Sequence, residues 1–335
     1  MKKACIVNAD SFYRNNRLFA LDDRIANRDN CLLPFYALKQ KLGESGFDLA
    51  TSDIHSTEDS ELVIYNEMPA RLPAADAVQK SYLLLFESEL IRPNNWQLER
   101  HRAFNKIFTW HDDFVDNKKY FKMNFAFQLP EQIKRDLAKK DKFCALIAGH
   151  KRVDHPLELY SKRVEAIRWF EHNHPQQFDL YGIGWDRYRF TGPKLWRALN
   201  RIGPLTKLLA QRYPSYRGRI DEKKSLLEQY RFSICFENAR DIPGYITEKI
   251  FDCFFAGCIP VYWGAGNILQ HVPAQCFVDR RDFSSYEDLY QYLIGMTDEE
   301  YLERLDAIQS YLCSTAAKEF SIEFFVQTIV QQVTA

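Results

Sequence analysis

Polar side chains gather where two apolar runs of the C-terminal half meet. Glu237 and Asn238 directly follow residues 232–236, an apolar and aromatic run that predicts a buried strand. Residues 247–249, Thr-Glu-Lys, precede a second apolar run whose spacing predicts a short helix. Because ligands of open α/β sheets bind at the carboxyl ends of the strands, this pattern predicts a binding site.

The expected helix start favours an anionic ligand. Thr247 stands at the N-cap position and Gly257 follows the apolar run, so both ends carry helix boundary signals. A helix N-terminus presents free N–H groups and a partial positive charge. Lys249 lies in the first turn, where the helix dipole normally disfavours a cation, so its position is better explained if a negative ligand completes the site. The alternative is that Lys249 points into solvent beside Glu248.

A second candidate group lies in the N-terminal half. Glu87 directly follows residues 81–86, Ser-Tyr-Leu-Leu-Leu-Phe, which predict another buried strand. A carboxylate at the carboxyl end of a strand, on the lip of a cleft, is placed to accept a proton from a substrate. The alternative is a solvated turn that carries a carboxylate.

These groups depend on strands that alternate with helices along the chain. Strands are expected at 4–7, 47–51, 62–65, 143–147 and 178–181, and helices at 34–42, 156–171, 298–312 and 321–333. The alternation predicts parallel sheets of the α/β class. The charged stretch 129–142 is expected to be a linker or a boundary helix between two domains. No G-x-G-x-x-G follows the first strand, so a nicotinamide-dinucleotide enzyme is set aside.

Composition sets further limits. The chain has 45 Lys and Arg against 45 Asp and Glu, so its overall charge gives no reason to expect a nucleic-acid partner. The eight Cys form no C-x-x-C pair, which indicates free thiols in a reducing compartment. No run approaches the roughly 18 apolar residues of a membrane span. With an N-terminus that predicts a strand, these features favour a cytoplasmic protein.

Residues 187–219 form an unusual segment, with nine Lys or Arg and no Asp or Glu. Its Leu, Ile and Trp residues recur near helical spacing, broken by Gly203 and Pro204. Such a basic amphipathic segment suits peripheral contact with an anionic membrane. Two other interpretations are a mobile flap over the ligand and a helical hairpin that packs on the domain with a basic outer face.

Three runs together closely resemble the donor-binding signature of glycosyltransferase family 10, the α-1,3/4-fucosyltransferases. They are Cys-Phe-Glu-Asn at 235–238, Tyr-Ile-Thr-Glu-Lys-Ile-Phe-Asp at 245–252 and Ala-Gly-Cys-Ile-Pro-Val-Tyr-Trp-Gly at 256–264. A looser resemblance, to the bacterial type, extends over about residues 82–293. It implies an α/β, GT-B fold, in which two Rossmann-like domains face a central cleft. The expected parts are an acceptor-side domain at 1–135, a GDP-sugar donor domain at 136–317, and a helix at 318–335 that crosses back to the first domain.

The resemblance also implies roles for single residues. Glu87 takes the place of the catalytic base, with Glu89 as its competitor. Arg163 takes the place of an arginine that pairs with the donor diphosphate, with Lys151 and Arg152 as competitors. No residue is predicted to bind a metal. The residues predicted to bind the donor are Arg163, Glu237, Asn238, Tyr245, Thr247, Glu248 and Lys249.

The implied activity is inverting transfer of L-fucose from GDP-fucose to a hydroxyl of an acceptor glycan. The expected position is O3 of GlcNAc or glucose, in lipopolysaccharide or surface polysaccharide synthesis. No cofactor is required, and stimulation by Mn²⁺ or Mg²⁺ is left open. The expected partners are a GDP-sugar and an oligosaccharide or glycolipid acceptor, and the expected place is the cytoplasm or the surface of the inner membrane. The alternatives are another GDP-sugar, a non-catalytic nucleotide-sugar-binding protein, and a hydrolase with Glu87 and Glu237 as paired carboxylates.

Overall fold

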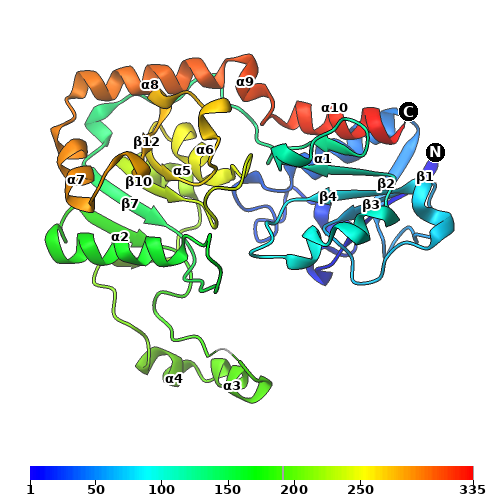
Figure 1. The fold of residues 1–335 in the computed structure, drawn as a ribbon, viewed down its shortest axis with the longest axis horizontal. Helices are drawn as coiled ribbons and strands as arrows, with labels where there is room; N and C mark the ends of the chain where they lie inside the picture. The colour runs from blue at the N-terminus through cyan, green and yellow to red at the C-terminus, as the bar shows by residue number, and fades with distance from the viewer. Residues whose placement is uncertain (191, 335) are drawn as a thin grey trace.

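Two six-stranded parallel sheets form the framework of the described residues, 1–190 and 192–334, of this computed structural model (Figure 1). Position 191, which belongs to the predicted basic segment 187–219, lies outside the described residues. The first sheet has the strand order β2-β1-β3-β4-β5-β6. Its strands are β1 (Lys2–Asn8), β2 (Phe47–Thr51), β3 (Leu62–Asn66), β4 (Ser81–Leu85), β5 (Lys106–Thr109) and β6 (Tyr120–Lys122).

The second sheet has the strand order β12-β11-β10-β7-β8-β9. Its strands are β7 (Lys142–Ile147), β8 (Phe178–Tyr181), β9 (Tyr216–Gly218), β10 (Tyr230–Phe236), β11 (Ile259–Trp263) and β12 (Val278–Asp279). In each sheet the chain reverses its direction of travel once, between β1 and β3 and between β7 and β10. Such switch points leave a crevice at the carboxyl ends of the strands, where ligands of this class of sheet bind.

Helices cover both sheets, which explains why the strands are apolar on both faces. The helices are α1 (Leu33–Glu44), α2 (Tyr160–Asn173), α3 (Lys194–Ala198), α4 (Gly203–Leu208), α5 (Lys223–Leu227), α6 (Glu248–Phe255), α7 (Tyr286–Gly295), α8 (Asp298–Leu312), α9 (Thr315–Lys318) and α10 (Ile322–Val333). The predicted α/β class with two Rossmann-like halves is therefore confirmed. In the stretch 129–142 the structure has a linker with one short 3₁₀ turn, Leu137–Lys139, and no α-helix.

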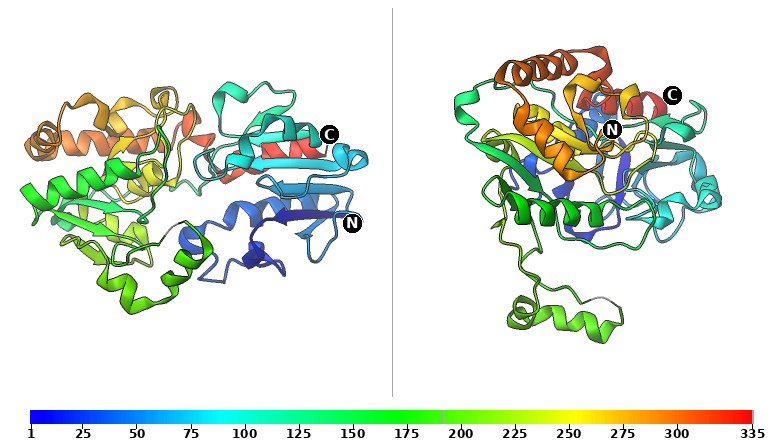
Figure 2. Two further views of the ribbon diagram at one scale, coloured as in Figure 1. Left: turned by 60° about the horizontal axis from the view of Figure 1, so that its bottom comes forward. Right: turned by 60° about the vertical axis from the view of Figure 1, so that its left-hand side comes forward.

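The last helix, α10, lies against the first half of the chain, beside α1 (Figures 1 and 2). Its apolar face joins the buried core of the first sheet, to which it contributes Phe325 and Ile329. Backbone bonds between Phe127 and residues 320–322 fix where the chain returns. The domain limits at residues 135 and 317 stay predictions.

The two halves also touch beside the cleft. The Asp112 carboxylate of the first half accepts hydrogen bonds from Asn267 Nδ2 (2.7 Å) and is 2.8 Å from His271 Nε2, both in the second half. Gly244 lies so close to the first half that an added Cβ would stand 2.2 Å from the Trp110 carbonyl oxygen. Its φ of +79° also favours glycine. The approach of the halves therefore depends on a side chain being absent at this position.

The packing of α10 can be tested at Phe325, whose side chain is 1% exposed and whose ring lies 6.2 Å from that of Phe35. Phe325→Ala should lower the free energy of unfolding by about 3–5 kcal/mol, because it opens a cavity in the core of the first half. Urea unfolding would measure the loss. Gln327→Ala, on the exposed face of the same helix, is the matched control and should change stability by less than about 0.5 kcal/mol. Equal stability of the two variants would contradict this packing.

Candidate functional site

A cleft of about 1070 Å³ lies at the carboxyl ends of both sheets and is lined by residues of both halves. This volume is slightly above the usual range of about 300–1,000 Å³ for small-molecule sites and suits a ligand with several groups. The cleft brings together seven of the eight residues that the sequence predicted to form a site. They are Glu87, Arg163, Asn238, Tyr245, Thr247, Glu248 and Lys249.

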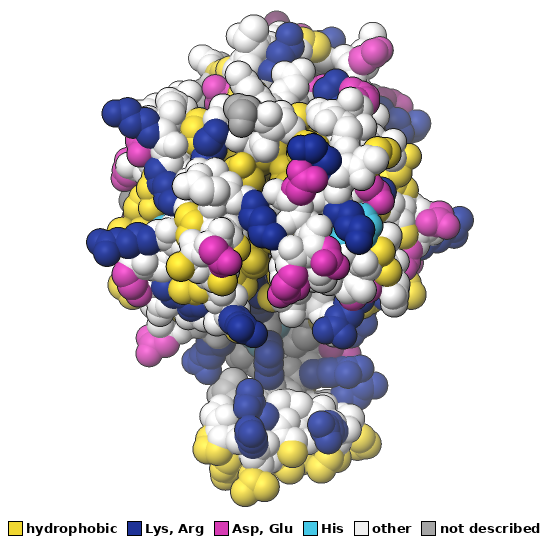
Figure 3. Space-filling view, turned by 90° about the vertical axis from the view of Figure 1, so that its right-hand side faces the viewer, with side chains coloured by type: hydrophobic (Ala, Val, Ile, Leu, Met, Phe, Trp, Pro, Cys, Tyr) yellow, Lys and Arg dark blue, Asp and Glu magenta, His cyan; other side chains and the backbone are white. Residues whose placement is uncertain are grey.

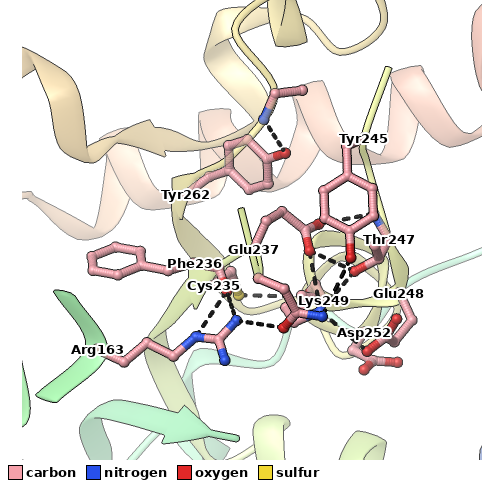
Figure 4. Close-up of polar contacts among 12 residues, drawn as sticks. Arg163, Cys235, Phe236, Glu237, Tyr245, Thr247, Glu248, Lys249, Asp252 and Tyr262 are labelled. Carbon is pink, nitrogen blue, oxygen red and sulfur yellow. Dashed lines mark hydrogen bonds and ion pairs between the residues drawn. The ribbon is translucent and has the colours of Figure 1, made fainter. Parts of the chain in front are cut away.

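Glu237 is the eighth residue, and its side chain points beneath the helix start instead of into the cleft (Figure 4). It has no exposed surface. Its carboxylate accepts the Thr247 backbone N–H (2.8 Å), the Thr247 hydroxyl (2.7 Å) and the Lys249 ammonium (3.1 Å). These bonds turn both carboxylate oxygens toward α6 and away from the cleft, so the structure favours a positioning role for Glu237, and its direct donor contact stays a prediction.

Thr247 occupies the N-cap position of α6, as the sequence predicted, with an extended backbone. Its side chain does not make the usual N-cap bond to the helix backbone. The hydroxyl instead donates to Glu237 and accepts from Lys249 Nζ at 2.8 Å. The Thr247 hydroxyl thus bonds the Glu237 carboxylate in place of the helix backbone. This puts the negative charge of Glu237 at the N-terminus of α6, where the helix dipole stabilises it.

Lys249 and Glu248 both line the cleft and are charged. Burial disfavours the Lys249 ammonium, but the carboxylates of Glu237 and Glu248 raise the pKa of Lys249 above its usual value. Partial burial opposes ionisation of the half-exposed Glu248 side chain, yet Lys249 and Lys223 lower the pKa of Glu248 to about 2. The N-terminus of α6 therefore presents a fixed cation beside a fixed carboxylate at the cleft.

Arg163, on α2, is 4% exposed and reaches the end of β10. Its Nε and Nη2 donate to the Phe236 carbonyl oxygen (3.2 and 2.6 Å), and Nη2 donates to Asn238 Oδ1 (3.0 Å). These bonds tie the guanidinium to the switch point of the second sheet. Among the competitors named from sequence, Lys151 lines the cleft, whereas Arg152 is exposed and is absent from its lining.

Glu87 enters the cleft from the end of β4, opposite α6. Its backbone N–H donates to Glu67 Oε1 (2.9 Å), and its carbonyl oxygen accepts from Asn95 Nδ2 and Trp96 Nε1, both at 3.1 Å. Burial raises the pKa of the Glu87 carboxyl, although Lys151 and Lys249 act against that shift. A carboxylate with a raised pKa on a fixed backbone is suited to accept a proton. Its competitor Glu89 is exposed and is absent from the lining of the cleft.

Glu67 was missed by the sequence analysis. It follows β3 directly, whereas Glu87 stands two residues after the end of β4, so the same strand-end rule would have found it. Its backbone has a φ of +75°, which is uncommon outside glycine, and its carboxyl accepts from the Glu87 N–H and from Asn95 Nδ2. Burial raises the pKa of Glu67 to about 7. Glu67 thus positions the backbone that carries Glu87.

Comparison with solved structures defines the class of the fold. An α1,3-fucosyltransferase with GDP-fucose superposes with a TM-score of 0.54 at 14% identity, covering 99% of this chain and 90% of that one. Anabaena Alr3699/HepE in complex with UDP-glucose gives 0.53 at 11% identity and covers all of both chains. The chain therefore has the GT-B fold of the glycosyltransferases.

Comparison of sequences matches part of the chain to one family within that class. Residues 206–322 match the model described as glycosyltransferase family 10 (fucosyltransferase) C-term, so the predicted family is confirmed for this part of the chain. The α-(1,3)-fucosyltransferase of Helicobacter pylori is 35% identical over 96 residues, which are 29% of this chain and 20% of that protein. The chain thus matches about a fifth of the length of this curated relative.

The raised pKa of Glu67 predicts a pH dependence of stability. A carboxyl whose pKa is higher in the folded than in the unfolded state destabilises the fold as it ionises, so stability should fall as pH rises from about 4.5 to about 7. The fall should be at most about 3–4 kcal/mol. The free energy of unfolding is measured in urea for wild type and Glu67→Gln at pH 5 and pH 8. The contribution of Glu67 is the difference between the two proteins in the change of this free energy from pH 5 to pH 8. Glu89→Gln, at an exposed position, is the control and should behave as wild type does. If Glu67→Gln shows the same pH dependence of stability as wild type, the raised pKa of Glu67 is contradicted.

Proposed function

We propose that this protein transfers L-fucose from GDP-fucose to a hydroxyl of an acceptor glycan. The observation that carries the proposal is that one cleft pairs the Lys249 site at the start of α6 with Glu87 on the opposite half. The family match of residues 206–322 supports fucose as the sugar, and the similar fold of a protein bound to GDP-fucose is consistent with it.

In the proposed reaction Glu87 accepts the proton of the acceptor hydroxyl. The hydroxyl oxygen forms a bond to the anomeric carbon of fucose while the bond from that carbon to the β-phosphate oxygen breaks. The configuration inverts, GDP leaves, and negative charge grows on the β-phosphate. Lys249, Arg163 and the N–H groups of α6 stabilise this charge, since their positions are fixed before the reaction. The raised pKa of Glu87 supports its role as the base.

The other cleft residues contact the donor in this proposal. Glu248 accepts from the ribose hydroxyls, Asn238 orients the phosphate or the fucose, and Thr247 and Tyr245 line the donor pocket. No step is assigned to a metal, and in this proposal Mn²⁺ or Mg²⁺ stimulates transfer without a fixed set of protein ligands. Within the described ranges no cluster of three or more His, Cys, Asp or Glu side chains could hold such an ion.

The proposed acceptor is O3 of a GlcNAc or glucose unit in a lipopolysaccharide or other surface polysaccharide. The α-(1,3) linkage named for the Helicobacter pylori relative supports this position. The proposed place of action is the inner face of the inner membrane, where the protein would be peripheral. None of the helices described is long and apolar enough to cross a membrane.

One alternative has an observation in its favour. The UDP-glucose complex of Anabaena HepE superposes as well as the fucosyltransferase does, so the fold alone is compatible with a donor sugar other than fucose. The hydrolase alternative loses support, because Glu237 is bonded to Thr247 and Lys249 and does not line the cleft with Glu87.

A panel of nucleotides tests the donor. The melting temperature should rise with GDP and GDP-fucose and stay unchanged with UDP or CMP. A ligand at 100 times its Kd stabilises by about 2.7 kcal/mol, which should raise the melting temperature by at least about 1 °C.

Lys249→Ala should weaken GDP binding about 10- to 100-fold, as the loss of a charged hydrogen bond does. Lys224→Ala, at an exposed lysine near α6, is the control for this variant and should bind GDP as wild type does. In the nucleotide panel, a rise of the melting temperature with UDP alone would exclude GDP-fucose as the donor.

The base is tested by transfer to a soluble GlcNAc-containing acceptor. Glu87→Ala should slow transfer by about 10²–10⁴-fold, because no other group in its place accepts the proton. GDP binding, measured by calorimetry, should stay close to wild type, since the proposed contacts to GDP come from the second half. Glu89→Ala is the matched neighbour and should keep full activity. Full turnover by Glu87→Ala would remove this residue from the reaction.

A further inference from the structure

The basic arm, residues 187–219, extends away from the body of the protein, with α3 and α4 at its far end (Figures 1 and 2). Both roots are anchored. The Trp185 ring stacks on His150 at 4.4 Å, and the Tyr213 ring lies under the Arg168 guanidinium at 3.9 Å. The arm is therefore held where it leaves and where it rejoins the second half.

The far end of the arm makes its own internal bonds. The Tyr188 N–H donates to the Thr206 carbonyl oxygen at 2.7 Å. The Asn200 amide bonds both backbone groups of Phe190, at 2.8 and 2.9 Å. Thr206 is 2% exposed and sits inside this unit. These bonds give the end of the arm a defined shape without packing against the body.

Large apolar side chains are concentrated on this unit. Leu195 is 85% exposed, Leu208 is 81% exposed and Trp196 is 58% exposed. Six of the fifteen exposed large hydrophobic side chains of the described residues lie within residues 188–209. Figure 3 shows apolar side chains together at the tip, with Lys and Arg next to them. The interpretation as a hairpin packed on the domain is therefore wrong, because this face is open to solvent.

The charge of the arm identifies the occupant of this face. All nine Lys and Arg side chains are exposed, and the arm has no Asp or Glu. Within the described part of the chain, Arg187 and Arg217 are the two that pair with carboxylates, those of Asp186 and Asp179. A face with apolar side chains at its tip and unpaired cations around them matches an anionic bilayer surface.

We propose that the basic arm docks on an anionic lipid bilayer, with Leu195, Trp196 and Leu208 in the interfacial layer and the basic side chains at the headgroups. The two roots of the arm reach the cleft, which is lined by Ile183 and Arg219. Docking would thus hold the mouth of the cleft near the membrane. Resting on the proposed function, this geometry favours a lipid-linked glycan as the acceptor.

Vesicle flotation of the full chain tests the docking. The protein should float with vesicles of equal parts phosphatidylcholine and phosphatidylglycerol, should not float with phosphatidylcholine alone, and should be released by high salt. Leu195→Glu/Leu208→Glu should reduce binding at least about tenfold, because charges do not enter the interfacial layer. Ile54→Glu/Leu269→Glu, two apolar side chains exposed elsewhere, is the matched control and should bind as wild type does.

Three results would overturn the proposal. They are equal flotation with both kinds of vesicle or with neither, unchanged flotation of the arm variant, and a wild-type dimer in solution that the arm variant abolishes. The last result would assign a second copy of the chain to this face. Loss of GDP stabilisation in the arm variant would instead assign the flap role. Flotation needs no donor or acceptor, so it can fail while transfer to a soluble glycan succeeds, and the two proposals fail separately.

Discussion

The site depends on one buried carboxylate, that of Glu237 at the end of β10. Its side chain has no exposed surface and binds the first turn of α6 through Thr247 and Lys249. Removing one partner of a buried ion pair leaves an uncompensated charge and costs about 3–5 kcal/mol. This bond therefore joins strand, loop and helix into one unit, and it sets the direction in which the N–H groups of α6 and the Lys249 ammonium face.

The second requirement is that the two halves stand at a fixed separation. Glu87 and Lys249 belong to different sheets, so their chemistry depends on contacts remote from both. α10 ties the end of the chain to the core of the first half, and Asp112 bonds Asn267 and His271 beside the cleft. The proposed mechanism places the base and the phosphate site on opposite sides of the reacting carbon, and these contacts keep that arrangement.

The ends of most strands could be predicted from the sequence, because an apolar run followed by polar residues marks the end of a buried strand, and the structure has strands at these runs. Whether a polar side chain at such an end points into the cleft could not be predicted. Glu237 and Asn238 are adjacent, yet one lies beneath α6 and the other lines the cleft, and only the tertiary bonds of Thr247 and Arg163 decide this. Glu67 stands after a strand and so follows the same rule, but its bond to the Glu87 N–H, twenty residues away in the chain, is visible only in the structure. The outward direction of the basic arm was likewise open, since a helical period does not tell what covers the apolar face.

The hydrogen bonds that Lys249 already makes limit how a diphosphate could bind in the proposed site. The Lys249 ammonium has three N–H donors, and three protein oxygens are already near it: Glu237 at 3.1 Å, Thr247 at 2.8 Å and Glu248 at 3.5 Å. In the proposed binding mode a phosphate therefore replaces one of them. The Glu248 contact is the longest, and its side chain is 41% exposed, whereas Glu237 is buried. Replacing Glu248 costs least and frees its carboxylate within the cleft, where the proposed ribose contact needs it.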